Sequence, residues 1–146
     1  MRRNRLVLDS LVGLSVGDAL GAQFEGHRFE LGRLDASFDS DSILLWTDDT
    51  QMALALVEVL LEAGEVQQDQ LASAFGRRYQ PLRGYGQSMH VVLPQLREGK
   101  DWRELQETVF PGGSWGNGAA MRVAPLGAFL HDAPVGTVIA EAERSA

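Results

Sequence analysis

Apolar side chains recur along this chain at helical spacing, and strand-like alternation is almost absent. The clearest apolar stripe begins after a polar cluster at residues 47–51 and stops at Gly64. A helix buries residues three or four positions apart, and glycine commonly ends one. The stripe consists of Met52, Ala55, Leu56, Val59, Leu60 and Ala63. It predicts a helix that starts at the polar cluster and buries this face.

Other segments carry the same period, at residues 8–20, 71–79, 89–96, 102–109, 120–130 and 135–142. Gly17 and Gly21 are expected to weaken the first, because glycine costs about 1 kcal/mol relative to alanine inside a helix. Proline lacks an amide donor, so Pro94 should kink its helix and Pro125 should bend or split 120–130. The nearest strand candidate is Ile43–Trp46. We predict an all-α orthogonal array or bundle.

Length and charge narrow the class of protein. The 146 residues suit one helical domain over 1–146, without repeats or a clear linker. Acidic residues outnumber basic ones by 20 to 13, and a net charge of −7 argues against binding to nucleic acid. The absence of cysteine excludes disulfides, thiolate ligands and a cysteine nucleophile. The N-terminal apolar stretch contains Asp9 and Asp18, which makes a poor signal peptide. We expect a cytoplasmic protein with no membrane partner.

The densest chemistry lies at Trp46–Gln51, where two adjacent carboxylates are flanked by hydroxyl groups. Hard cations such as Mg²⁺ and Mn²⁺ take oxygen ligands, so Thr47, Asp48 and Asp49 indicate a metal-dependent hydrolase. The alternative is a helix cap, because Asp48 and Gln51 approximate a capping box. One carboxylate satisfies a cap, which leaves Asp49 in excess. Both interpretations stay open.

Glycine clusters indicate close backbone approach to a ligand. Ten of the 16 glycines fall in three groups: 13, 17, 21 and 26; 84 and 86; 112, 113, 116 and 118. Tight turns in loops explain any one group of glycines. Three such groups beside polar residues favour a site whose backbone amides bind a phosphate or a sugar. No nucleotide-loop signature is present.

Four motifs occur in a characteristic order. They are Gly17–Gly21 with Glu25 behind it, Thr47–Thr50, Arg83–Gly86, and Ser114–Arg122 followed by Pro125. In this order and spacing, between residues 13 and 130, the chain resembles the ADP-ribosylglycohydrolase family. The resemblance implies an all-α fold with a two-metal Mg²⁺ or Mn²⁺ centre. It also implies hydrolysis of the bond between ADP-ribose and a protein or small-molecule acceptor.

The resemblance also implies roles for individual residues. Thr47, Asp48 and Asp49 would be metal ligands, and Glu25 would act with the two aspartates in catalysis. The substrate pocket would be lined by Gly84, Tyr85, Gly86, Gln87, Ser114, Trp115, Gly116, Asn117 and Gly118. The partner would be an ADP-ribosylated protein or an ADP-ribose-like small molecule.

One departure from the family concerns the second ligand cluster. Family members are normally longer and supply further metal ligands from an Asp-x-Asp-Thr motif near the C-terminus. The acidic residues after Met121 are Asp132, Glu141 and Glu143. Asp39–Ser42 precedes Thr47, and we interpret it as a solvated loop. We therefore expect an apparently truncated N-terminal half of a glycohydrolase domain, whose isolated activity is in doubt.

Each candidate also has a plainer interpretation. Glu25 is a general base or a surface carboxylate, and Asp18 caps a turn or supports the site. Asn117 binds the substrate or takes the left-handed conformation of an Asn-Gly turn. Trp115 and Tyr85 stack on a ring or pack partly buried. For Arg122, we favour an ion pair or a surface position over contact with a phosphate.

Two other functions stay open. The chain could bind ADP-ribose without cleaving it, or it could be a helical interaction domain whose acidic cluster caps a helix. The acceptor and the oligomeric state are not predicted.

Overall fold

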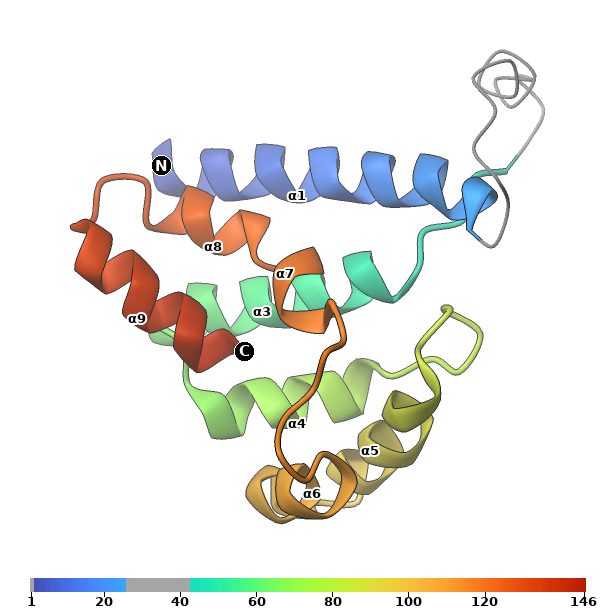
Figure 1. The fold of residues 1–146 in the computed structure, drawn as a ribbon. Helices are drawn as coiled ribbons and strands as arrows, with labels where there is room; N and C mark the ends of the chain where they lie inside the picture. Colours follow the sequence, from blue (N-terminus) through green and yellow to red (C-terminus); the bar gives the residue numbers. More distant parts are fainter. Residues whose placement is uncertain (1, 26–42) are drawn as a thin grey trace.

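The computed structural model describes residues 2–25 and 43–146, and this part of the chain is helical without a strand (Figure 1). The all-α prediction is confirmed. The elements are α1 (Arg2–Gly21), the short 3₁₀ helix η1 (Ala22–Phe24), α3 (Asp48–Ala63), α4 (Gln68–Arg78), α5 (Gln87–Arg97), α6 (Trp102–Val109), α7 (Gly118–Met121), α8 (Ala124–Phe129) and α9 (Val135–Ser145).

Several helix boundaries follow from local chemistry. Helix α3 ends where Gly64 takes a left-handed φ of +79° and its amide donates to the Leu60 carbonyl. The segment 120–130 is split as predicted, because Pro125 lies at the start of α8 and cannot continue α7. Helix α1 continues unbroken through its glycines. Residues 43–46 form no strand, and Asp39–Ser42 lies outside the described residues.

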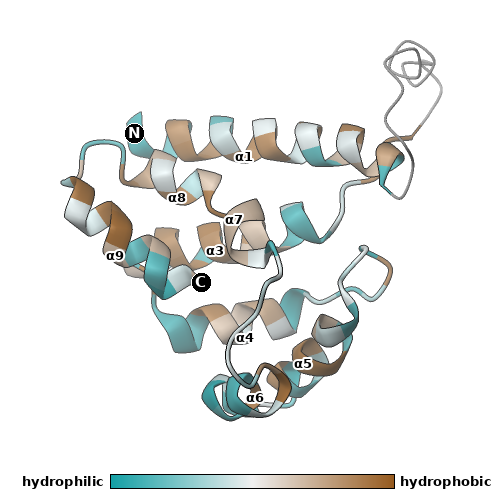
Figure 2. Cartoon of the chain, viewed as in Figure 1, coloured by the Kyte–Doolittle hydropathy of each residue, from teal (hydrophilic) through white to brown (hydrophobic). Residues whose placement is uncertain are grey.

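Helix α3 lies at the centre of the fold, with α1 on one side and α4 on the other (Figure 1). Its apolar stripe meets α1, α4 and α8 in one core cluster. That cluster is built around Val7, Leu56, Leu60, Leu71, Leu126 and Phe129. The first turn of α3 is hydrophilic, whereas the following turns are largely hydrophobic (Figure 2). The core therefore holds α3 in place and leaves its polar start at one edge.

A smaller core cluster holds the loops beside that edge. Met52, Tyr79, Tyr85 and Leu93 are buried together, and Met121 from α7 packs against them. Tyr79 and Tyr85 meet edge to face, with ring centroids 5.3 Å apart. This cluster places the 80–86 loop and α7 beside the first half of α3.

The segment Arg2–Phe24 is long and apolar enough to cross a membrane by length and composition alone. A mostly buried core helix and a signal sequence near the N-terminus pass the same test, and only 17% of this segment's apolar window is buried. Here α1 packs against α3 and α8, with Val7 and Ala19 buried. Its Asp18 bonds to the start of α3, so α1 has a structural role within the fold.

Candidate functional site

Asp18 of α1 caps the N-terminus of α3. Its carboxylate accepts the Thr47 N–H at 2.8 Å and the Thr50 N–H at 3.1 Å. It also accepts both threonine hydroxyls, each at 2.6 Å. Thr47 is the N-cap residue and Thr50 lies in the first turn, so these amides are among those a helix leaves without an internal partner. One carboxylate, from a helix that is distant in sequence but adjacent in space, therefore accepts two of the free amides at the start of α3.

The predicted capping box of Asp48 and Gln51 is wrong. Asp48 is already inside the helix, and the N-cap residue is Thr47. Gln51 is buried, and its side-chain oxygen accepts the Tyr85 hydroxyl at 2.9 Å and the Gln80 amide at 3.2 Å. Gln51 therefore ties α3 to the 80–86 loop instead of reaching back to the helix start. Asp18 takes over the capping role, which leaves Asp48 and Asp49 without it.

Both of these aspartates lie at the predicted place, in the first turn of α3, and both are half-buried. Burial, followed by the charge of Asp49, raises the pKa of Asp48 to about 6. Burial, followed by the charge of Asp18, raises the pKa of Asp49. Within residues 2–25 and 43–146, no ion pair neutralises either carboxylate. Among the described residues, the helix start therefore carries negative charge without a counter-ion.

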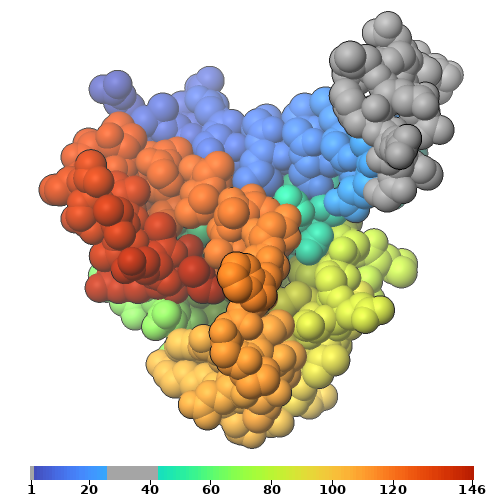
Figure 3. Space-filling model, viewed as in Figure 1, coloured from blue at the N-terminus to red at the C-terminus, as the bar shows by residue number. Residues whose placement is uncertain are grey.

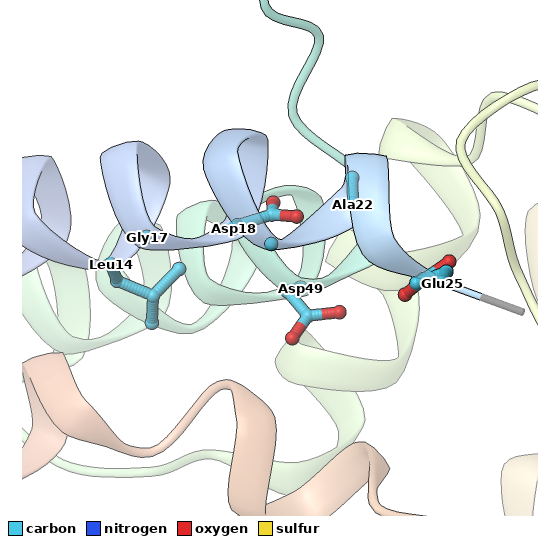
Figure 4. A pocket seen from close by; sticks show the side chains of 7 residues that line it. Leu14, Gly17, Asp18, Ala22, Glu25 and Asp49 are labelled. Carbon is cyan, nitrogen blue, oxygen red and sulfur yellow. The ribbon is translucent and has the colours of Figure 1, made fainter. Parts of the chain in front are cut away.

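Asp49 faces an open pocket of about 400 Å³ between α1 and the start of α3. Leu14, Gly17, Asp18, Gly21, Ala22 and Glu25 complete its lining. Figure 4 shows the carboxylates of Asp18, Asp49 and Glu25 around this space. A Cβ atom at Gly17 or Gly21 would meet nothing within 4 Å, so these glycines leave open space on the α1 side of the pocket. Three acidic residues of the first two motifs, Asp18, Glu25 and Asp49, thus line one pocket, and no basic residue of the described chain lines it with them.

Asp48 faces the third motif instead. Gly84 has a left-handed φ of +83°, and a Cβ there would lie 3.7 Å from Asp48 Oδ1. The Asp48 amide donates to the Arg83 carbonyl at 2.7 Å. The Arg83 side chain donates to the Trp46 carbonyl at 2.9 Å and stacks on the Trp46 ring. The glycine therefore brings a bare backbone against the Asp48 carboxylate.

The other residues of the third motif separate into two groups. Tyr85 is buried in the small core cluster, as the packing interpretation expects. Gly86 and Gln87 are exposed at the start of α5. A pocket role for these three residues stays a prediction.

The fourth motif lies on the same face as the start of α3. Figure 3 shows the α7 region next to the start of α3, with the 80–90 region beyond it, and Figure 1 shows the segment before α7 leading away toward α6. Trp115 is fully exposed, so its ring packs against none of the described residues. Asn117 has a φ of −79°, so the alternative interpretation, a left-handed Asn-Gly turn, is wrong. The Ser114 hydroxyl accepts the Gly116 amide at 3.1 Å. These residues do not line the pocket beside Asp49.

Arg122 is a buried residue that the sequence pattern misassigned to an ion pair or the surface. It is 5% exposed, lies over the Phe75 ring, and donates to the carbonyls of Gly118 and Ser145. Burial lowers its pKa to about 10. Arg122 therefore fastens α7 to α9 through Ser145 and to α4 through Phe75, and no local pattern in the sequence marks this burial.

The oxygen atoms of Thr47, Asp48 and Asp49 are of the kind that a hard cation takes as ligands. The Thr47 hydroxyl has one proton, and its 2.6 Å contact with Asp18 is shorter than its 3.3 Å contact with Asp49. Its remaining lone pairs are therefore free to meet a cation, beside two carboxylates that have no ionic partner in the part of the chain that the structure describes. Among the described residues, no group of three acidic or histidine side chains could hold a metal alone. Such an ion would keep several water ligands, which Mg²⁺ tolerates.

Asp48 should give the metal-free chain a characteristic pH dependence of stability. Its folded pKa of about 6 lies above the ordinary 3.8, so its contribution is largest at low pH and is lost as pH rises through 6. Relative to Asp48→Asn, the free energy of unfolding should fall by about 1 kcal/mol between about pH 4 and pH 7, allowing for solvent screening. Urea denaturation of both chains in chelator measures this difference.

Glu58 is the control of opposite sign. Burial alone would raise its pKa, but hydrogen bonds from Arg78 and Arg77 lower it. The difference between native chain and Glu58→Gln should therefore shrink as pH falls. A pH-independent difference for Asp48→Asn would contradict the assignment of a raised pKa to Asp48.

Comparisons with known proteins agree with these motifs. A family model described as ADP-ribosylglycohydrolase matches residues 1–146. ADP-ribosylhydrolase ARH3 of Xenopus tropicalis is 38% identical over 130 residues, which are 80% of this chain and 37% of that protein. The human ADP-ribosylhydrolase ARH3 is 36% identical over 134 residues, again 80% of this chain and 37% of that protein. An uncharacterised protein of Archaeoglobus fulgidus is 32% identical, covering 83% of this chain and 42% of its own length. The chain thus spans less than half of each of these relatives.

Proposed function

Because the chain belongs to the ADP-ribosylglycohydrolase family, we propose that it supplies part of the active site of an enzyme that hydrolyses the glycosidic bond of ADP-ribose. The observation that carries this proposal is the division of labour at the start of α3. Asp18 accepts the free amides at the start of α3, so neither Asp48 nor Asp49 is needed as a helix cap. Both remain half-buried and have no ionic partner in the described chain.

The charge of the site supports a metal-dependent reaction. The pocket is lined by Asp18, Glu25 and Asp49, and Asp48 lies next to it in sequence. ADP-ribose carries a diphosphate, which these carboxylates would repel. Thr47, Asp48 and Asp49 would hold Mg²⁺ or Mn²⁺. When bound, such an ion neutralises the site and lowers the pKa of a water molecule.

The residues of the chain have separate tasks in this proposal. Cleavage at the ribose C1 passes through an oxocarbenium-like state and needs an activated water molecule. Glu25 is exposed at the pocket and within electrostatic reach of Asp48, so it is the candidate general base. The bare backbone of Gly84 and the wall formed by Gly17 and Gly21 give the sugar room to approach.

The fourth motif would hold the nucleotide end of the substrate. The fully exposed Trp115 ring has both faces free for a base to stack on. Ser114, Gly116, Asn117 and Gly118 flank Trp115 in sequence and would offer hydroxyl, amide and backbone groups. The acceptor, the group from which ADP-ribose is cleaved, would be a protein side chain or a small molecule and would lie at the open side of the pocket.

An ADP-ribose-binding module is the second candidate function. It is favoured by one observation: no three acidic or histidine side chains of the described chain form a metal site by themselves. Calorimetry with ADP-ribose beside a hydrolysis assay separates the two functions. Binding without release of acceptor would favour the module.

The metal proposal predicts a metal-dependent thermal shift. Millimolar Mn²⁺ or Mg²⁺ should raise the Tm of the native chain by a small amount, because a weakly held ion stabilises only by RT ln(1 + [L]/Kd). Asp48→Ala should remove this shift, since it deletes a ligand. Differential scanning fluorimetry over a metal series tests it, with Asp9→Ala as an exposed control on α1. Identical metal responses of native chain and Asp48→Ala would remove Asp48 from the site.

A further inference from the structure

Asp18 makes more contacts with the start of α3 than capping requires. A helix N-terminus gains most from one acceptor placed near its first free amides. Asp18 provides this for the Thr47 and Thr50 amides, and in addition accepts both hydroxyl protons. The hydroxyl contacts, at 2.6 Å, are its shortest. The extra contacts determine where two hydroxyl protons point.

The two hydroxyls differ in what lies beyond them. Thr50 is buried at 3% exposure, and its hydroxyl serves only the helix start. Thr47 is half-buried, and its hydroxyl lies 3.3 Å from the Asp49 carboxylate that faces the pocket. If the Thr47 proton pointed toward Asp49, it would occupy the space between these oxygens. The bond to Asp18 draws that proton to the other side.

We propose that Asp18 is a positioning residue for the cation site: it takes the Thr47 hydroxyl proton and so presents the oxygen lone pairs to a cation held with Asp49. Asp18 does not itself bind the cation. The inference rests on the proposed function, because it assumes that Thr47 and Asp49 are ligands. It adds that α1 controls the affinity of the site through one carboxylate.

The position of Asp18 in the fold supports this role. Asp18 belongs to the same helical segment as Gly17, Gly21 and Glu25, which line the pocket. Its four bonds join that segment to Thr47 and Thr50, 29 and 32 residues away in sequence. The contact therefore fixes both walls of the pocket relative to each other. Partners that orient metal ligands in this way typically change metal affinity by about 10- to 100-fold when replaced.

Asp18→Asn is the sharpest variant for a test. Asparagine keeps the size and one acceptor oxygen, but its NH₂ group would donate to a threonine oxygen. The Thr47 hydroxyl would then have to turn its proton toward Asp49. We expect the variant to bind Mn²⁺ about tenfold or more weakly than the native chain. The free Mn²⁺ signal in electron paramagnetic resonance measures this affinity, with folding verified by circular dichroism at the same temperature.

Two controls separate this role from helix capping and from net charge. Thr50→Val removes one hydroxyl bond to Asp18 without changing Thr47, so its Mn²⁺ affinity should stay within about threefold of native. Asp9→Asn makes the same charge change at an exposed position on α1 and should also stay near native. An equal loss of affinity in Thr50→Val and Asp18→Asn would show that only the helix cap matters, and would overturn the inference.

Other outcomes are equally decisive. Native affinity in a folded Asp18→Asn overturns the inference and leaves the proposed function intact. No Mn²⁺ binding by the native chain overturns both. If Asp18→Asn does not fold, Thr47→Val replaces it: native affinity in that variant contradicts the proposal, because the Thr47 oxygen would then not be a ligand for Asp18 to position.

Discussion

The chain of residues 1–146, supplied with ADP-ribosylated peptide and millimolar Mg²⁺, is expected to release ADP-ribose at least about a hundredfold more slowly than human ADP-ribosylhydrolase ARH3. Thr47, Asp48 and Asp49 are the ligands that we propose, and the described residues hold no group of three acidic or histidine ligands. Two ions are then not fixed at a set separation, and a displacement of about 1 Å can cost roughly a hundredfold in rate.

Chromatographic measurement of released ADP-ribose at matched metal concentration tests this expectation. Asp48→Ala of the same chain provides the background rate, because it removes one proposed ligand. Turnover by the native chain close to that of the human relative would show that the Asp-x-Asp-Thr cluster is dispensable. It would also show that the catalytic ions are misplaced in our account.

Replacing Gly76 with alanine is expected to destabilise the fold by about 2–4 kcal/mol. Gly76 lies where α4 crosses α5, and an added Cβ would be 2.6 Å from the Arg97 nitrogen and 2.8 Å from the Leu96 carbonyl carbon. Both are backbone atoms, so no side-chain rotation relieves the clash. Arg97 also donates to the Gly76 carbonyl at 2.9 Å, and this bond would be lost if the helices moved apart. Urea denaturation measures the effect.

Gly13→Ala is the matched control within helix α1. A Cβ at Gly13 meets nothing within 4 Å, so the change should stabilise the chain by about 0.5–1 kcal/mol through helix propensity. Similar stabilities of Gly76→Ala and the native chain would mean that α4 and α5 are farther apart than described here.

The helices were predictable where a local residue decides the outcome. Gly64 ends α3 because only glycine readily takes the left-handed φ of +79° found there. Pro125 starts α8 because its ring cannot continue α7. Gly17 and Gly21 were expected to weaken α1, yet the helix continues through Gly17 as far as Gly21, because its packing on α3 and α8 outweighs the low helix propensity of glycine.

The acidic cluster was predictable, but its cap was not. Adjacent aspartates before an apolar stripe place Asp48 and Asp49 in a first turn by local rules. The acceptor for that turn comes from Asp18, and nothing in the local pattern marks a partner 29 to 32 residues away. Gln51 was assigned to a capping box for the same reason: its partners lie in the 80–86 loop, and the local pattern does not mark them.

Whether the aromatic and basic residues of the motifs are buried or exposed could not be predicted, because hydrophobic periodicity does not show it. Tyr85 and Trp115 both stand beside glycine, but Tyr85 is 6% exposed and Trp115 is fully exposed. The difference arises because Tyr85 meets Tyr79 and Gln51, whereas Trp115 lies on the loop before α7. Arg122 is buried for a similar reason, since α7 and α9 converge on it.

Crystals of the chain soaked in Mn²⁺ and measured at the manganese absorption edge test the central claim most directly. The account predicts an anomalous peak within coordination distance, about 2.0–2.6 Å, of oxygens from Thr47, Asp48 or Asp49, with Asp18 oriented toward the threonines and not bound to the ion. A peak elsewhere, or no peak at saturating Mn²⁺, would contradict the assignment of the metal centre to the start of α3.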